Sequence, residues 1–311
     1  MSDKKGPLVS VVITNYNYAQ YVGEAIESVL NQTYKNLEII VIDDGSTDDS
    51  LDEIDVYQSK IRIVARENRG VVYTRNEGIS LAKGEFICFL DADDYLDRDY
   101  IEKTVNCAIK NKSDVVYTNF KKFGAETEVS SFHEYNLEEL KNGNFIHVSS
   151  LIRRSALSGV RFDEELSGKT HEDWDFFLSM GVGGARMTIC KNTFLNYRIH
   201  NAGRNNTMTL GAERLRYMSI YSYIIRKHIK AGHSGFDYLI GPIFADWCHS
   251  IYNDKQKLEV QKDEIIQQRD GQIAEILNSK SYKVGKVAVS PVRIIRKATR
   301  HTKSALGRNR H

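Results

Sequence analysis

The segment 86–95 constrains the fold more than any other stretch of this 311-residue chain. Five apolar residues (86–90) have the length and composition of a buried strand, and Asp91, Asp93 and Asp94 follow directly. Because unpaired charge is costly to bury, the chain must leave the sheet at Asp91. Ligands of open α/β sheets bind at this carboxyl edge. Alternation along an extended segment would place Asp91 and Asp93 on one side, where two carboxylates suit a divalent cation. Taken alone, the pattern also fits a solvated acidic turn.

Apolar periodicity predicts strands and helices in alternation over the first half of the chain. We expect strands at 8–14, 37–42, 61–64, 86–90 and 114–120, helices at 21–30, 70–82, 99–111 and 147–155, and short strand-like runs within 187–198. This alternation predicts a parallel sheet with right-handed crossovers. Residues 14–16, 43–44 and 91–94, which follow three of the strands, are then expected to meet at one edge of the sheet.

Composition places limits on the compartment and the partners. The four cysteines are far apart and show no metal-binding spacing, so we expect reduced thiols in a reducing compartment. Neither a signal peptide nor a membrane-spanning run is apparent, and this predicts a protein that is cytoplasmic or peripheral at the inner face of the cell membrane. The segment 280–311 carries ten basic and no acidic residues, which leaves about −8 on residues 1–279 by subtraction from the net charge of +2. Body and tail should therefore have different partners.

The C-terminal third is predicted to be an extension of the main domain. We divide the chain into a catalytic domain (1–205), a helical segment packing on the core or a partner (206–255), and a final segment (256–311) with a coiled-coil helix and a basic tail. The apolar residues of 257–277 span about three heptads, a marginal coiled-coil signal through which the chain could form a homo-oligomer. The basic amphipathic tail suits an anionic membrane surface. A solvated, disordered tail is the alternative.

Six short motifs together resemble the family-2 inverting glycosyltransferases of bacterial cell-surface glycan synthesis. In chain order they are Ser10–Asn17 with Ser28–Tyr34, Glu38–Asp48, Asn68–Gly70 with Thr74–Asn76, Asp91–Asp94, Glu172–Asp175 and Tyr197–His200. Each motif is weak alone, but they occur in the family's order and cover residues 8–200. The resemblance implies an α/β protein of GT-A fold, with a Rossmann-like, mostly parallel sheet flanked by helices and, here, a C-terminal helical extension.

The resemblance implies a nucleotide-sugar site, with a uridine diphosphate sugar as the favoured donor. The implied donor contacts are Thr14, Tyr16, Asp44, Asn68, Arg75, Asp91 and Ala92. Tyr16 offers a flat face for stacking on a base. Asp44 can accept a hydrogen bond from an imide N–H, which uracil has and cytosine lacks. Considered alone, Tyr16 could instead pack on the sheet edge, and Asp44 could stabilise a turn.

A departing diphosphate needs a cation to stabilise its charge. Asp93 is the main predicted ligand of Mn²⁺ or Mg²⁺, and the Tyr-Arg-Ile-His motif makes His200 the second. For a lone histidine, a structural role is the alternative. Asp91 is expected to contact the ribose, and Asp94 to brace the loop.

Inversion needs a base on the acceptor hydroxyl, opposite the leaving group. Asp173 is the predicted base, and Glu172 and Trp174 are predicted acceptor contacts, although both acids could instead cap a helix. The expected reaction is a single displacement onto a saccharide or lipid-linked acceptor. The alternative function is a catalytically inactive sugar-nucleotide-binding or scaffold protein of the same fold. No dinucleotide-binding, P-loop or nucleic-acid recognition motif occurs.

Overall fold

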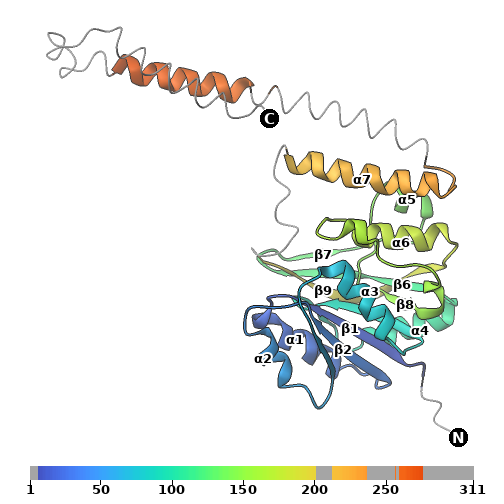
Figure 1. Cartoon of the computed structure of the whole chain (residues 1–311). Coiled ribbons are helices and arrows are strands. Elements are labelled where there is room, and N and C mark those ends of the chain that lie inside the picture. Colours follow the sequence, from blue (N-terminus) through green and yellow to red (C-terminus); the bar gives the residue numbers. More distant parts are fainter. Residues whose placement is uncertain (1–5, 201–211, 237–255, 257–258, 276–311) are drawn as a thin grey trace, which may run out of the picture. The chain divides into compact units, whose positions relative to one another are not determined.

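The computed structural model describes residues 6–200, 212–236, 256 and 259–275 (Figure 1). The chain divides into two compact units, Met1–Ala245 and Asp246–His311. In the second unit the described helix, 259–275, is exposed along its whole length. Among the described residues no helix is both long and apolar enough to cross a lipid bilayer. The predicted basic tail, 280–311, lies outside the described residues.

Nine strands in the described part of the first unit form one sheet, in the order β3-β2-β1-β4-β8-β6-β9-β5 with β7 paired to β6. Their bounds are β1 Val9–Asn15, β2 Leu37–Asp43, β3 Arg62–Ala65, β4 Phe86–Asp91, β5 Tyr95–Leu96, β6 Val115–Gly124, β7 Glu128–Ser130, β8 Leu151–Arg153 and β9 Met187–Ile199. The first four strands are parallel, as predicted. Beyond them β8 runs antiparallel to both β4 and β6, so the whole sheet is mixed.

Helices cover both faces of this sheet (Figure 1). They are α1 Ala19–Leu30, α2 Ser50–Asp55, α3 Val71–Leu81, α4 Tyr100–Asn111, α5 Leu137–Asn142, α6 Glu172–Val182 and α7 Ala212–Lys230, with 3₁₀ turns at Arg154–Leu157 and Glu164–Leu166. The helix predicted at 147–155 is wrong. Leu151 and Ile152 instead belong to strand β8, which pairs with β4 on one side and β6 on the other, and both side chains are fully buried. Pairing between distant strands therefore overrides the local pattern.

Side chains alternate across the first strand and divide the core into two layers. Val11 and Ile13 of β1 face the layer that contains the apolar sides of α1 and α4, whereas Val12 faces the layer of α3 and α6. The buried residues of α1, at positions 22, 25, 26 and 29, follow the helical spacing that the sequence shows. Gly78 lets α3 approach closely, since a Cβ there would lie 2.6 Å from Val12 Cγ1.

Helix α7 lies on the side of α6 that faces away from the sheet (Figure 1). Tyr221 stacks on Trp174 of α6, with ring centroids 4.6 Å apart. Lys227 Nζ donates to Asp163 Oδ2 at 2.8 Å and to Asp175 Oδ2 at 2.7 Å. Both apolar and ionic contacts therefore attach this helix to the main domain. The rest of the predicted helical segment, 206–211 and 237–255, lies outside the described residues.

Candidate active site

The ends of the parallel strands bring polar side chains together at the carboxyl edge of the sheet. Thr14 Oγ1, at the end of β1, donates to Asp91 Oδ1 of β4 at 2.8 Å. Asn15 Nδ2 donates to Asp43 Oδ1 of β2 at 2.7 Å. The predicted meeting of three strand ends is therefore present. Thr14 uses its hydroxyl on a carboxylate, which makes it a positioning residue for Asp91 as well as a candidate donor contact.

The Asp91–Asp94 segment forms a turn, not the extended chain that we predicted. The Asp94 N–H donates to the Asp91 carbonyl at 3.0 Å, and the Ala92 N–H donates to the Thr14 carbonyl at 3.0 Å. Ala92 is fully buried, so its side chain is not available to a donor. Asp91 nevertheless lies close enough to Asp93 for its charge to shift the pKa of Asp93. Burial and the charge of Asp91 raise the pKa of Asp93, and His200 partly offsets this.

Asp93 and His200, the two predicted metal ligands, lie side by side. Asp93 Oδ2 lies 3.0 Å from His200 Nε2, although 107 positions separate the residues. The His200 ring packs against Tyr18 and Tyr21, with centroids 5.7 and 5.1 Å away. A carboxylate oxygen and an imidazole nitrogen suit Mn²⁺ or Mg²⁺. Among the described residues no set of three metal-ligating side chains converges, so the remaining ligands of such an ion would come from elsewhere, as diphosphate oxygens do in many magnesium sites.

Arg198 and Asp94 hold this pair in place, and we assigned neither of them a binding role from the sequence. The Arg198 N–H donates to Asp94 Oδ1 at 2.8 Å, and its Nε donates to the Asp93 carbonyl at 2.8 Å. Its guanidinium also pairs with Glu24 and lies over the rings of Tyr21 and Phe123. Burial and the neighbouring Asp93 raise the pKa of Asp94. Asp94 thus braces the loop, as expected.

Arg75 lies inside the site, between its two acidic ends. Its side chain is 2% exposed. Nη2 donates to the Asp91 carboxylate at 3.1 and 3.2 Å, and Nη1 donates to Glu172 Oε1 at 3.0 Å. Burial alone would lower its pKa, but Asp91 and Glu172 reverse this and raise it. In this conformation Arg75 therefore connects β4 to α6 and positions both carboxylates, instead of reaching a nucleotide directly.

Asp173, at the start of α6, is a carboxylate with the properties of a proton acceptor. Burial and the adjacent Glu172 raise its pKa to about 6, against the opposing charge of Arg75. Asn144 Nδ2 donates to Asp173 Oδ2 at 2.9 Å, and the Trp174 N–H donates to Asp173 Oδ1 at 2.8 Å. Asn144 fixes the direction of the carboxylate. It lies in a polar stretch without periodicity, so no pattern in the sequence indicated it.

Trp174 does not have the position expected of an acceptor contact. The side chain is 0% exposed, its indole N–H donates to the Leu140 carbonyl at 2.6 Å, and its ring stacks on Tyr221. A fully buried side chain cannot touch the acceptor, so the predicted direct contact of Trp174 with the acceptor is not supported. Trp174 instead supports Asp173 from the core side.

The predicted base-binding residues surround the end of β2. Tyr16 is 46% exposed at the rim, as a stacking surface requires. Asp44 is buried and accepts hydrogen bonds from the Arg69 N–H at 2.8 Å and the Gly70 N–H at 2.7 Å, as well as an ion pair from Arg66. Asp44 therefore fixes the loop that carries Asn68 beside it. Only one of these contacts uses Oδ2, which leaves that oxygen able to accept another hydrogen bond.

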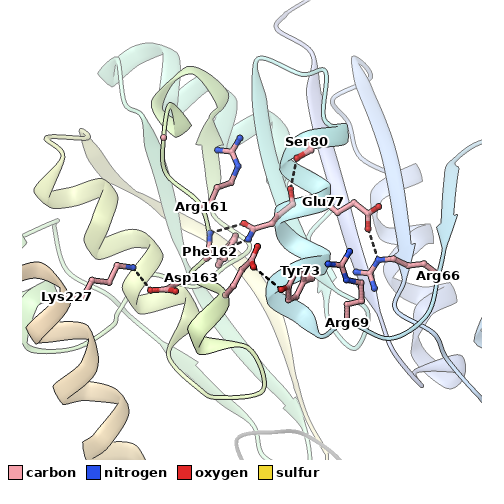
Figure 2. Close-up of a pocket in the computed structure, with 12 residues that line it drawn as sticks. Arg66, Arg69, Tyr73, Glu77, Ser80, Arg161, Phe162, Asp163 and Lys227 are labelled. Atoms are coloured by element: carbon pink, nitrogen blue, oxygen red, sulfur yellow. Dashed lines mark hydrogen bonds and ion pairs between the residues drawn. The ribbon is translucent and has the colours of Figure 1, made fainter. Parts of the chain in front are cut away.

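A groove of about 810 Å³ lies beside this end of the site, on the outer side of α3 (Figure 2). It is lined by Arg66, Arg69, Tyr73, Asn76, Glu77, Ser80, Gly159, Arg161, Phe162, Asp163, Glu164 and Lys227. Many of its polar groups pair with each other: Arg66 Nε donates to Glu77 at 2.8 Å, and Tyr73 Oη donates to Glu164 at 2.9 Å. Phe162 separates the groove from Arg75, whose guanidinium lies 5.5 Å from its ring centroid.

Solved structures confirm the predicted fold. The Staphylococcus aureus protein TarS, in its crystal structure with UDP-GlcNAc, has a TM-score of 0.59 and 21% identity, over 70% of this chain and 66% of that chain. The mannosyltransferase PcManGT from Pyrobaculum calidifontis, in complex with GDP-Man and Mn²⁺, has a TM-score of 0.57 and 16% identity, over 90% and 83%. At such identities the likeness concerns the fold alone.

Sequence relatives identify the family. The chain is 34% identical to an uncharacterized glycosyltransferase of Haemophilus influenzae, over 55% of this chain and 71% of the relative. It is 30% identical to the glycosyltransferase GlyG of Streptococcus pneumoniae, over 63% of this chain and 61% of that protein, and 28% identical to the hyaluronan synthase of Pasteurella multocida, over 86% and 28%. The chain thus matches less than two thirds of the length of several relatives. The family model for glycosyl transferase family 2 matches residues 10–163, and with these relatives it shows that the chain belongs to glycosyltransferase family 2.

Proposed function

We propose that this protein is an inverting glycosyltransferase that moves a sugar from a nucleoside diphosphate donor to a hydroxyl group of a saccharide or lipid-linked acceptor. The observation that carries the proposal is the Asp173 carboxylate, with a pKa raised to about 6 and a direction fixed by Asn144. A carboxylate with these properties is unprotonated at neutral pH and is more basic than an ordinary aspartate, as a general base requires.

The donor is a uridine diphosphate sugar in this proposal. Tyr16 stacks on the base, and Asp44 Oδ2 accepts from the imide N–H of uracil, with Asn68 beside it. TarS, which shares the fold, has been crystallised with UDP and with UDP-GlcNAc, whereas PcManGT carries GDP-Man. The hydrogen bond from an imide N–H to Asp44 distinguishes uracil from cytosine. Guanine is the alternative base, and the experiment below tests it.

Charge on the diphosphate has to be neutralised as the sugar leaves. Asp93 and His200 would hold Mn²⁺ or Mg²⁺, and this ion would supply that neutralisation when bound. Asp91, oriented by Thr14 and Arg75, is placed to accept from a ribose hydroxyl. Asp173 removes the proton of the acceptor hydroxyl as its oxygen attacks the anomeric carbon. A single displacement of this kind inverts the configuration and needs no covalent intermediate.

A panel of nucleotide sugars tests the donor, with and without Mn²⁺. A ligand that binds only the folded state raises the melting temperature, by an amount equivalent to about 2.7 kcal/mol at 100 times its Kd. We expect a shift with a uridine diphosphate sugar that depends on Mn²⁺ and disappears in Asp93→Ala. A shift with guanosine diphosphate sugars alone would reverse the choice of base.

Turnover tests the reaction itself. Release of nucleoside diphosphate should be abolished in Asp93→Ala and Asp173→Asn, whereas Glu165→Gln, an exposed acid near α6, should behave like the wild type. NMR of the product should show the anomeric configuration opposite to that of the donor. Tight donor binding without turnover on any acceptor would instead support the inactive sugar-nucleotide-binding protein considered above.

A further inference from the structure

Two cysteines that are far apart in the sequence meet between α4 and β9. Cys190 Sγ donates to the Lys103 carbonyl of α4 at 3.7 Å. Cys107 is one turn further along the same helix, and helical side chains lean back over the preceding turn, which places the Cys107 thiol above Lys103. The two thiol groups therefore lie near each other, close enough for each to shift the pKa of the other. Both residues are half-buried, so small reagents can reach them.

The backbone next to Cys190 is irregular. Thr118 of β6 pairs with Cys190, but the next residue, Asn119, pairs with Phe194, so three residues of β9 bulge out of the ladder. Within this bulge Asn192 has a φ of 60°, in the left-handed region. A bulge bends its strand and re-aims the side chains beside it. Cys190, at the last regular pair before the bulge, is directed in this way toward α4.

The two thiols differ in reactivity. The neighbouring Cys107 thiol lowers the pKa of Cys190 to about 6; Thr193, whose Oγ1 lies 3.4 Å from Sγ, and the Lys103 ammonium add to this against the effect of burial. The neighbouring Cys190 and burial together raise the pKa of Cys107. Cys190 is therefore suited to attack a disulfide as a thiolate. Cys107 is suited to attack the mixed disulfide that Cys190 then carries.

We propose that Cys107 and Cys190 form a redox-active pair that closes to an intramolecular disulfide. With a low-molecular-weight disulfide such as glutathione disulfide, the Cys190 thiolate attacks one sulfur and releases one glutathione. Cys107 then loses its proton and attacks the Cys190 sulfur of the mixed disulfide, which releases the second glutathione. Two protein thiols are oxidised and one glutathione disulfide is reduced to two thiols.

The disulfide would connect α4 to the strand that carries Arg198 and ends beside His200. Because it would close a long loop of the chain, it should make the oxidised protein harder to unfold. This inference uses no property of the donor or acceptor site, so it stands or fails independently of the proposed function.

The experiment exposes the full-length protein to glutathione disulfide and maps its peptides by mass spectrometry without reduction. The wild type should give a peptide pair joined through Cys107 and Cys190, which dithiothreitol separates. Cys107→Ser should instead accumulate a mixed glutathione disulfide on Cys190, because the resolving thiol is missing. Cys190→Ser should give neither product and should lack the higher melting temperature of the oxidised wild type.

A double variant, Cys88→Ser with Cys248→Ser, serves as the matched control because it keeps the pair and removes the other two cysteines. It should form the same joined peptides as the wild type. Disulfide-linked dimers, a stable glutathione adduct on the wild type, or two thiols that stay reduced in the folded protein would each overturn the proposal.

Discussion

At the scale of single residues, Arg75 makes the two ends of the site depend on each other. Its buried guanidinium holds Asp91 at the donor end and Glu172 at the acceptor end. Removing one partner of a buried ion pair leaves an uncompensated charge, which typically costs about 3–5 kcal/mol. Arg75→Met should lower the free energy of unfolding by this order in urea titrations. Arg161→Met, an exposed arginine bonded only to backbone carbonyls, should change it by less than about 1 kcal/mol.

Asp173 links activity to stability through its pKa. The base must be unprotonated, so the rate of transfer should rise with pH through about 6 and then level off. The folded pKa lies above the unfolded value of about 4, so the folded protein binds this proton more tightly and loses stability as pH rises from about 4 to 6. Asp173→Asn should therefore abolish transfer and raise the free energy of unfolding at pH 8 by up to about 2.7 kcal/mol, the equivalent of two pKa units. Equal or lower stability of the variant at pH 8, measured by urea unfolding, would contradict this account.

At the scale of elements, Lys227 attaches α7 to the domain. Asp175 is 0% exposed and depends on the Lys227 ammonium 2.7 Å away. Lys227→Met should destabilise the protein by about 2–3 kcal/mol, because the buried carboxylate loses the ammonium on Oδ2 and, among the described residues, keeps only His228 Nε2, 3.6 Å from Oδ1. Lys230→Met, at the exposed end of the same helix, should have almost no effect. Adding Asp175→Asn to Lys227→Met should restore part of the loss, and further destabilisation by the second change would argue against this ion-pair account.

Elements with local patterns are the ones that the sequence predicts well. The strands β1, β2 and β4 and the helices α1, α3 and α4 lie within about two residues of the predicted positions, because their apolar spacing is a property of the segment itself. The second half of the sheet depends on pairings between distant strands, so β8 was mistaken for a helix. The motifs predicted a single site for Asp93 and His200, and these two side chains lie 3.0 Å apart. The position of Asn144, and the approach of Cys190 to the helix that carries Cys107, follow from tertiary packing alone. They left no pattern in the sequence.

At the scale of the whole molecule, the two compact units carry opposite charge. The segment 280–311 at the end of the second unit carries ten basic and no acidic residues, whereas residues 1–279 carry a net charge of about −8. An anionic surface should therefore attract the tail and repel the rest of the chain. We expect the full chain to float with vesicles containing phosphatidylserine at low salt and to dissociate as salt screens the charges.

A chain ending at Ala245, the boundary of the first unit, separates the roles of the two units. It should keep the melting temperature of the full chain and its shift with donor and Mn²⁺, because the described site residues all lie within this unit. It should not float with anionic vesicles, since it lacks the basic tail. Flotation equal to that of the full chain would assign membrane binding to the first unit. Loss of the donor-dependent shift would mean that residues 246–311 contribute to the site, and the domain division proposed from the sequence would have to be redrawn.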